Sequence, residues 1–451
     1  GFDTFIEEQN LYYCKNLPDE QIADLFLDAT LPEWLRTNLR AYLKKTDTPL
    51  SVRSSSLLED GQFKPYAGLY STYFLANNHS DFEERFAQLE SAIKLVYAST
   101  WFEGPMAFSQ VTGIGREDSM AVIIQQLAGE KHEHFYYPGV SGVAQSHNFY
   151  PVMGMKPEEG IAHIAMGVGK TVVEGGKALW FSPAKPKKLV QFSSVENMLK
   201  YSQNQFYALD VSPENCLERD ISNLVLRNVQ EAQREKPVSL LASTYIHSEE
   251  RVRDAVVPGT KILTFAQMLK YDSYPLAKIL SELLAICKVG MGGEVEIEFA
   301  VDVDQDIGAS TFYFLQVRPM ITGGEYAEVQ ICDNEVERAV CHVHSSLGHG
   351  QYDNIRDIVY VHPSKFDGAK TGDMALEIGE INRRLLAEKT PFLLIGPGRW
   401  GSSDHWLGIP VQWSDISGVA AIIEIKNGAI KADPSQGTHF FQNITSLGIP
   451  Y

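Results

Sequence analysis

Apolar and polar residues alternate most regularly in two neighbouring stretches, residues 294–300 and 311–317. A period of two is typical of β-strands that bury one face. The Asp-Gln-Asp-Ile-Gly run at residues 304–308 separates the two stretches and has the composition of a turn. The pattern therefore predicts a half-buried β-hairpin.

Four polar side chains occupy alternate positions of this hairpin. Glu296 and Glu298 share one face of the first strand, and Gln316 and Arg318 alternate likewise on the second. Carboxylate and amide oxygens suit Mg²⁺, and a fixed guanidinium suits phosphate oxygens. The hairpin is consistent with a metal-bound polyphosphate site, but a surface cross-strand ion pair would use the same residue types.

Helical periodicity dominates other parts of the chain. Residues 18–45 predict two amphipathic helices divided at a Leu-Pro dipeptide, and residues 275–289 predict another helix. The clearest helix is expected at residues 80–102, where Ser80 and Glu83 form a capping box. These helices are interpreted as packing elements.

Composition narrows the class of protein. The chain has 451 residues, which exceeds one typical domain, so we expect two or three lobes. Its 39 basic and 57 acidic residues give a formal charge of −18, which disfavours nucleic acid and anionic membranes as partners. Five cysteines without a CxxC pair indicate a reducing, cytoplasmic compartment. The chain opens with Gly inside a helix-like pattern, so we expect a piece of a longer protein.

Three further stretches carry residues suited to a nucleotide. Arg53 is followed by three serines, which suits phosphate contact or a solvated loop. The β-branched run at residues 120–127 predicts a buried strand that contains Gln125. Gly167 and Gly169 form a GxG turn, which any tight strand-to-helix junction can use.

Together these stretches resemble the nucleotide-binding domain of the phosphoenolpyruvate synthase and pyruvate phosphate dikinase family, which is an ATP-grasp domain. The segments EIEFAVD and FLQVRPM of the hairpin resemble the last strands of that domain. The resemblance implies that Glu298 and Gln316 bind Mg²⁺, with Glu296 in support. It also implies that Arg318 touches the transferred phosphate, so that Arg53, Glu298 and Arg318 are the catalytic residues.

Other motifs extend the resemblance over residues 49–320. The segment around Arg53 is similar to the family's VRSSATAED, whose Arg binds the ATP phosphates. Residues 66–72 are similar to its FAGQQET loop, which covers the phosphates; Gly68 and Thr72 match, and the three residues between them differ.

The adenine side of the site shows the same kind of resemblance. Residues 120–127 resemble the family's VQRMV strand, and Gln125 takes the position of its Gln. Gly167 and Gly169 match its WGLGEMVVQG turn, in which Lys170 replaces a Glu.

The implied architecture belongs to the α+β class. We expect a first ATP-grasp lobe over residues 1–215, a second lobe with the hairpin over 216–322, and a β-rich extension over 323–451. The family's TSHAAI-type phosphohistidine sequence, its phosphoenolpyruvate-binding barrel and its GGK-type turn near the start are not found at the expected places.

The extension holds polar groups that allow two interpretations each. The Gly-rich loop at Arg399 suits an anion site or a tight turn. His439 suits a phosphate carrier or a core position beside two aromatic residues. His342, His344 and His349 suit metal ligation or an exposed strand face.

The expected function is the ATP-binding part of a phosphoenolpyruvate synthase-like kinase or phosphotransferase. It would transfer a phosphoryl group from Mg-ATP to a His or a small acceptor outside this chain, with a phosphohistidine-bearing domain as partner. The alternative is a nucleotide-sensing module of a multidomain protein that binds ATP without turning it over.

Overall fold

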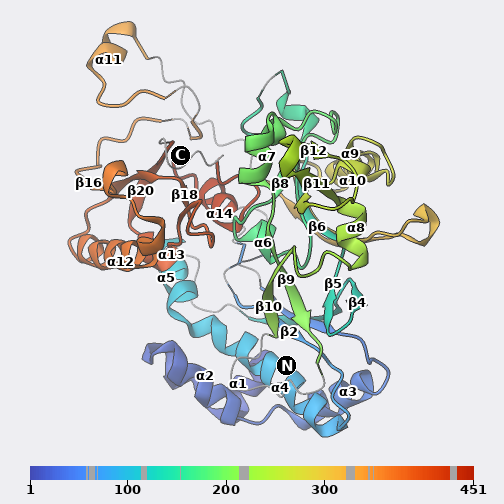
Figure 1. Ribbon diagram of the computed structural model, residues 1–451. Helices are drawn as coiled ribbons and strands as arrows, with labels where there is room; N and C mark the ends of the chain where they lie inside the picture. Colours follow the sequence, from blue (N-terminus) through green and yellow to red (C-terminus); the bar gives the residue numbers. More distant parts are fainter. Residues whose placement is uncertain are drawn as a thin grey trace.

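The computed structural model describes residues 1–56, 59, 67–68, 70–112, 119–152, 154–212, 223–320, 331–343, 346–348, 350–426 and 434–451 (Figure 1). Helices and sheets are mixed throughout, which confirms the α+β class at that coarse level. Within these described ranges, no helix has both the length and the apolarity needed to cross a membrane.

The N-terminal part packs helices against a three-stranded antiparallel sheet of order β2-β1-β3. Its elements are α1 (Phe2–Gln9), α2 (Asp19–Asp28), α3 (Glu33–Leu43), β1 (Leu50–Ser55), β2 (Tyr73–Leu75), α4 (Phe82–Ala98), α5 (Glu103–Thr112) and β3 (Ala121–Gln126). The two predicted helices before residue 45 are confirmed as α2 and α3. Fully or nearly fully buried rings of Phe5, Phe26 and Phe86 lie at the centre of this part.

Two local predictions in this part are corrected. Asp81, rather than Ser80, caps α4, because its side chain accepts a hydrogen bond from the Glu83 amide at 2.9 Å. The strand β3 exists, but in the described part of the chain it pairs only with β1 and lies at the edge of its sheet. Ile123 of β3 is therefore 45 % exposed, and the expectation of a buried strand is wrong.

The second part is built on a five-stranded antiparallel sheet of order β15-β14-β6-β7-β8. Its strands are β6 (Val140–Gln145), β7 (Ile161–Ala165), β8 (Leu179–Phe181), β14 (Val295–Asp302) and β15 (Thr311–Pro319). The predicted hairpin is confirmed as β14 and β15. It is not half-buried as expected, because β14 is an interior strand whose residues are nearly all buried.

Smaller sheets and helices surround this central sheet. The strands form one sheet of order β10-β9-β5-β4 and another of order β12-β11-β13. They are β4 (Glu130–His132), β5 (Phe135–Tyr137), β9 (Gln205–Asp210), β10 (Leu224–Asn228), β11 (Ala242–Ile246), β12 (Arg251–Arg253) and β13 (Thr260–Leu263). The helices are α6 (Lys170–Val173), α7 (Val195–Tyr201), α8 (Lys236–Leu241), α9 (Ala266–Leu269) and α10 (Leu276–Met291), the last of which was predicted.

The C-terminal part contains a three-stranded parallel sheet of order β16-β17-β20 and a two-stranded pair, β18 with β19. Its elements are α11 (Asp333–Arg338), β16 (Asp357–Tyr360), α12 (Thr371–Ala387), β17 (Phe392–Pro397), β18 (Arg399–Trp400), β19 (Gly408–Ile409), α13 (Trp413–Ile416), β20 (Val419–Ile425) and α14 (His439–Leu447). Short 3-10 turns complete the chain: η1 (Leu11–Asn16), η2 (Ser99–Trp101), η3 (Pro157–Glu159), η4 (Val190–Phe192), η5 (His247–Glu249), η6 (Ile307–Ala309), η7 (Pro363–Lys365) and η8 (Gly368–Lys370).

The C-terminal part is not β-rich, contrary to the expectation. Parallel neighbours such as β16 and β17 need a crossover connection, and α12 supplies it with 17 residues. The described residues after 330 therefore hold more helix than strand. The part is also not detached, since α5 and α13 lie side by side (Figure 1). Phe108 of α5 is fully buried, and its ring centroid lies 6.4 Å from that of Trp413 of α13.

Candidate active site

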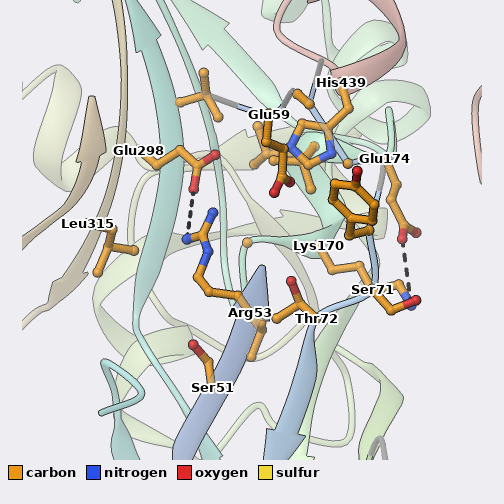
Figure 2. A pocket seen from close by; sticks show the side chains of 18 of the residues that line it. Ser51, Arg53, Glu59, Ser71, Thr72, Lys170, Glu174, Glu298, Leu315 and His439 are labelled. Atoms are coloured by element: carbon orange, nitrogen blue, oxygen red, sulfur yellow. Dashed lines mark ion pairs between the residues drawn. The ribbon is translucent and has the colours of Figure 1, made fainter. Parts of the chain in front are cut away.

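A cavity of about 710 Å³ lies where the three parts meet. Strands β1 and β3 and residues 67–68 and 70–72 line it from the N-terminal part, and β6, β14 and α6 line it from the second part. The beginning of α14 closes it from the C-terminal part. Figure 2 shows polar side chains from all three parts pointing into the same space.

The hairpin positions two polar pairs opposite each other. Glu298 faces Gln316 in the register of β14 and β15, and Glu296 faces Arg318. Arg318 Nη2 lies 3.3 Å from Glu298 Oε1 and donates a 2.9 Å hydrogen bond to Gln316 Oε1. The predicted convergence of these side chains is therefore present in the structure.

Arg53 joins the same cluster from the other side of the cavity. It lies on β1, and its Nη2 donates to Gln316 Oε1 at 2.5 Å, while Nη1 lies 3.7 Å from Glu298 Oε2. The dashed line between Arg53 and Glu298 in Figure 2 marks this ion pair. Arg53 and Arg318, which are far apart along the chain, thus place Glu298 between two guanidinium groups.

The two glutamates have opposite electrostatic environments. Burial raises the pKa of Glu296, and the charge of Arg318 and a 2.6 Å hydrogen bond from Gln145 Nε2 only partly oppose this. Burial also acts on Glu298, but the charges of Arg318 and Arg53 outweigh it and lower its pKa. Glu298 therefore keeps its negative charge more readily than Glu296.

The oxygen atoms of Glu298 and Gln316 fit a magnesium ion by their chemistry. Mg²⁺ prefers one or two carboxylates and phosphate oxygens over a full protein cage. Glu298 lines the cavity, whereas Glu296 is buried beside Gln145 and does not. Among the described residues, no group of three or more His, Cys, Asp or Glu side chains is arranged to hold a metal on its own.

The loop that carries Gly68 and Thr72 lies at the mouth of this cluster. Both residues line the cavity. Gly68 has φ of +66°, and a Cβ atom there would lie 2.4 Å from Nδ1 of His439. Only glycine permits this close approach. Tyr66 and Leu69 of the same loop lie outside the described residues.

For His439, the sequence did not decide between a phosphate carrier and a core residue. It is the first residue of α14, after Thr438, whose Oγ1 caps the helix by accepting from the Phe441 amide. Within the described chain, its buried Nε2 has no hydrogen-bond partner. Burial and the charge of Arg318 lower the pKa of His439 to about 4, although Glu298 opposes this, so the imidazole is neutral near pH 7.

Three other residues of the C-terminal part bond to the cluster or its supports. Asn443 accepts from the Ala67 amide at 2.8 Å and donates to the Ala67 carbonyl at 3.0 Å. Gln442 Oε1 accepts from Arg318 Nη1 at 3.4 Å. Gln436 donates to Gln145, which in turn holds Glu296. No sequence signal pointed to these residues, because their partners are far away along the chain.

The remaining predicted nucleotide contacts lie on the walls of the cavity. Gln125 of β3 lines it opposite Ser51 of β1, and Gly169 lines it at the start of α6. Gly167 shapes the same turn: it has φ of +92°, and a Cβ there would lie 2.5 Å from the Tyr207 carbonyl. Lys170 also lines the cavity.

Two other candidates of the sequence have local partners. Lys170 lies 3.6 Å from Glu174. Arg399 donates to the Gly175 carbonyl at 3.2 Å, and Ser403 donates to the Glu174 carbonyl, so the Gly-rich loop packs on the α6 turn. His342 is exposed and not in a strand, while His344 and His349 lie outside the described residues.

One comparison with known proteins identifies a family. The family model described as "Pyruvate phosphate dikinase, AMP/ATP-binding domain" matches residues 11–339, which is well over half of the chain. No curated protein matches the sequence. The matched segment contains Arg53 and the whole β14–β15 hairpin but ends before the C-terminal helix that carries His439.

Proposed function

Because the chain belongs to the family of the pyruvate phosphate dikinase AMP/ATP-binding domain, we propose that it binds Mg-ATP in the central cavity and transfers a phosphoryl group. The observation that carries the proposal is the cluster of Arg53, Glu298, Gln316 and Arg318. Three of its members, Arg53, Glu298 and Arg318, line that cavity. The adenine would lie against β3 and Gln125.

Each residue has a distinct role in this proposal. Glu298 and Gln316 would hold Mg²⁺, which when bound would neutralise phosphate charge. Arg53 and Arg318 would turn their N–H groups from these oxygens to the phosphate oxygens and stabilise the charge that develops during transfer. Glu296, which is buried and linked to Gln145, supports the strand from behind.

The architecture would be that of an ATP-grasp enzyme. We place the first lobe before β4 and the second from β4 to β15, because the five-stranded sheet joins β6, β7 and β8 to the hairpin. The boundary expected at residue 215 would divide that sheet between two lobes. The residues after 330 form the third wall of the cavity rather than a remote extension.

The acceptor in this proposal is His439, within the chain and not outside it. Its neutral imidazole carries a lone pair on one ring nitrogen, and the buried Nε2 has no competing partner in the described structure. Arg318 and Glu298 are the charged groups that act on it most strongly. A phosphoryl group held by the arginines would therefore lie next to a suitable nucleophile.

The proposal is tested with the 451-residue chain, Mg²⁺ and ATP. Calorimetry measures binding, and incubation with radiolabelled ATP followed by denaturation measures acid-labile phosphate on the protein. We expect saturable binding and a label that His439→Asn abolishes. The control is His134→Asn, since His134 is exposed and remote in sequence from every residue of the cluster. A wild-type chain that binds no nucleotide would overturn the proposal.

A nucleotide-sensing module is the second candidate. The observation in its favour is Lys170, which stands where the related domain has a Glu and pairs with Glu174 on the cavity wall. Sensing predicts tight Mg-ATP binding with no label on any histidine and no release of phosphate. The same two measurements therefore separate the candidates.

A further inference from the structure

The cavity wall has a third basic side chain, Lys170, to which the proposed function assigns no role. Within the described residues, the lysines and arginines that line the cavity are Arg53, Lys170 and Arg318. The side chain of Lys170 is 38 % exposed, against 20 % for Arg53 and 4 % for Arg318. Lys170 is therefore the most accessible cation of the described wall.

The turn that carries Lys170 covers the face of the central sheet from which Glu298 points. Val172 of α6 shares a small apolar cluster with Val143 of β6, and Val143 pairs with Glu298 of β14. Paired residues of neighbouring strands point to the same face and lie about 5 Å apart. In Figure 2, Lys170 and Glu174 lie on the side of the cavity opposite Glu298. Lys170 and Glu298 therefore face the same space.

The Gly-rich loop around Arg399 holds this turn in place. Arg399 Nη1 and Ser402 Oγ donate to the Gly175 carbonyl at 3.2 and 3.0 Å. The backbone amide and the hydroxyl of Ser403 donate to the Glu174 carbonyl at 3.0 and 3.1 Å. These bonds use the backbone of the turn, so the side chains of α6 stay available to a ligand.

Resting on the proposed binding of Mg-ATP, we propose that Lys170 is a ligand of the ATP polyphosphate and exchanges Glu174 for a phosphate oxygen. Glu298 offsets one of the two arginine charges in the cluster, so the cluster alone neutralises little of the polyphosphate charge. An ammonium on a long flexible stem adds positive charge without breaking the ion pairs of the cluster. The loop around Arg399 is then the support of this ligand.

Glu174 is a weak partner for Lys170, which makes the exchange possible. Nζ of Lys170 lies 3.6 Å from Oε1 of Glu174, and both side chains are partly exposed. Ion pairs of this kind contribute little to stability. Burial also raises the pKa of Glu174, and the charge of Lys170 opposes this only in part, so the carboxylate holds its charge weakly. A phosphate oxygen offers Lys170 a stronger, charge-assisted hydrogen bond.

The test titrates the full chain with the β,γ-methylene analogue of ATP and Mg²⁺ in a calorimeter. Lys170→Met removes the charge and keeps an unbranched side chain. We expect it to weaken binding by about 10- to 100-fold, the value of one hydrogen bond to a charged group. Glu174→Gln removes the competing charge, so it should tighten binding by about two- to fivefold, the value of an exposed ion pair.

Two further variants isolate the contact. Lys170→Arg keeps a cation at this position and should bind the analogue within about threefold of the wild type. Lys177→Met is the matched control, because Lys177 belongs to the same segment but does not line the cavity. It should change the affinity by less than about twofold, since a charge outside the cavity is screened.

The outcomes separate this inference from the function on which it rests. Weaker binding in both Lys170→Met and Glu174→Gln would show a structural ion pair, and a Glu174→Gln protein that binds no more tightly than the wild type would show that the carboxylate does not compete. Unchanged affinity of Lys170→Met, or an equal loss in Lys177→Met, would show that Lys170 makes no specific contact. Each of these results overturns the inference alone. A wild-type chain that binds no analogue would overturn the proposed function and this inference with it.

Discussion

At the scale of single residues, the environment of a carboxylate decides its chemical use. Glu296 and Glu298 are two positions apart on one strand, and Glu296 is the more buried of the two. Their pKa values shift in opposite directions. The difference is the number of guanidinium groups near each carboxylate: Glu298 has two, and Glu296 has Arg318 and a neutral amide. Identical side chains can therefore have separate roles in one site.

This contrast gives a matched pair of variants. Glu298→Gln should lower Mg-ATP affinity by about 10- to 100-fold, because it removes a charged oxygen from the proposed metal site. Glu296→Gln should change it by less than about threefold, since burial already favours the neutral form there. Calorimetry with and without Mg²⁺ measures both. Equal losses in the two variants would contradict the assigned roles.

A second residue-scale prediction concerns Asp302 at the end of β14. Burial raises its pKa to about 6, and the hydrogen bond from Tyr313 opposes this only in part. Because the folded-state pKa lies above the ordinary value of 3.8, the folded protein binds this proton more tightly than the unfolded chain. The contribution to stability is present below pH 4 and is lost as the pH rises through 6.

Asp302→Asn should therefore raise the free energy of unfolding at pH 7.5 by roughly 2–3 kcal/mol, as expected for a shift of about two pKa units. Urea denaturation at several pH values measures it. The gain should vanish near pH 4, where the wild-type carboxyl is protonated. A gain of equal size at both pH values would show that the cause is not this proton.

At the scale of elements, the contact of α14 with the loop around Gly68 depends on that glycine. Gly68→Ala would place a Cβ 2.4 Å from His439 Nδ1 at a φ of +66°. We expect a loss of roughly 1–2 kcal/mol in the free energy of unfolding from the backbone alone, and a loss of phosphoryl label on His439. Denaturation and labelling measure the two effects.

The control for this prediction is Gly290→Ala. Gly290 lies within α10, and an added Cβ there would have no neighbour within 4 Å. That variant should stabilise the protein by roughly 0.5–1 kcal/mol, because alanine is a better helix former than glycine. A destabilised Gly290→Ala protein would show that the comparison does not isolate strain.

The elements also show how far sequence reasoning reaches. Helices α2, α3 and α10 and the β14–β15 hairpin follow from periodicity, which is a property of neighbouring residues. The prediction that β3 is buried was wrong, because an edge position depends on which strands pair and not on the strand's own composition. The parallel C-terminal sheet was missed for the same reason, since short apolar runs do not reveal their crossover helix.

The candidate site divides in the same way. The hairpin residues share one local pattern. Arg53 was identified because its segment is similar to the family's VRSSATAED. Gln442 and Asn443 have neither, and Asn443 bonds to Ala67, which is 376 positions away. No local spacing can encode such a contact. The sequence pointed to His439, but only the packing of α14 shows that this residue lines the cavity.

At the scale of the whole molecule, one cavity has walls from all three parts, so a bound nucleotide should act on all three. We expect the ATP analogue to slow amide hydrogen exchange in β1, β14 and α14 together. Mass spectrometry of peptides measures the exchange. The internal control is α12, which does not line the cavity. Protection of β1 and β14 without α14 would contradict a site shared by three parts.

The order of the walls along the chain has a consequence for synthesis. Strand β15 ends at Pro319 and α14 begins at His439, about 120 residues later. A ribosome that adds about 5–20 residues per second needs roughly 6–24 s for that distance. During this time the nascent polypeptide already has the arginines and acids of the cluster, but it lacks His439, the acceptor in the proposed transfer. Under the proposed function, phosphoryl transfer to His439 can therefore begin only after synthesis of α14.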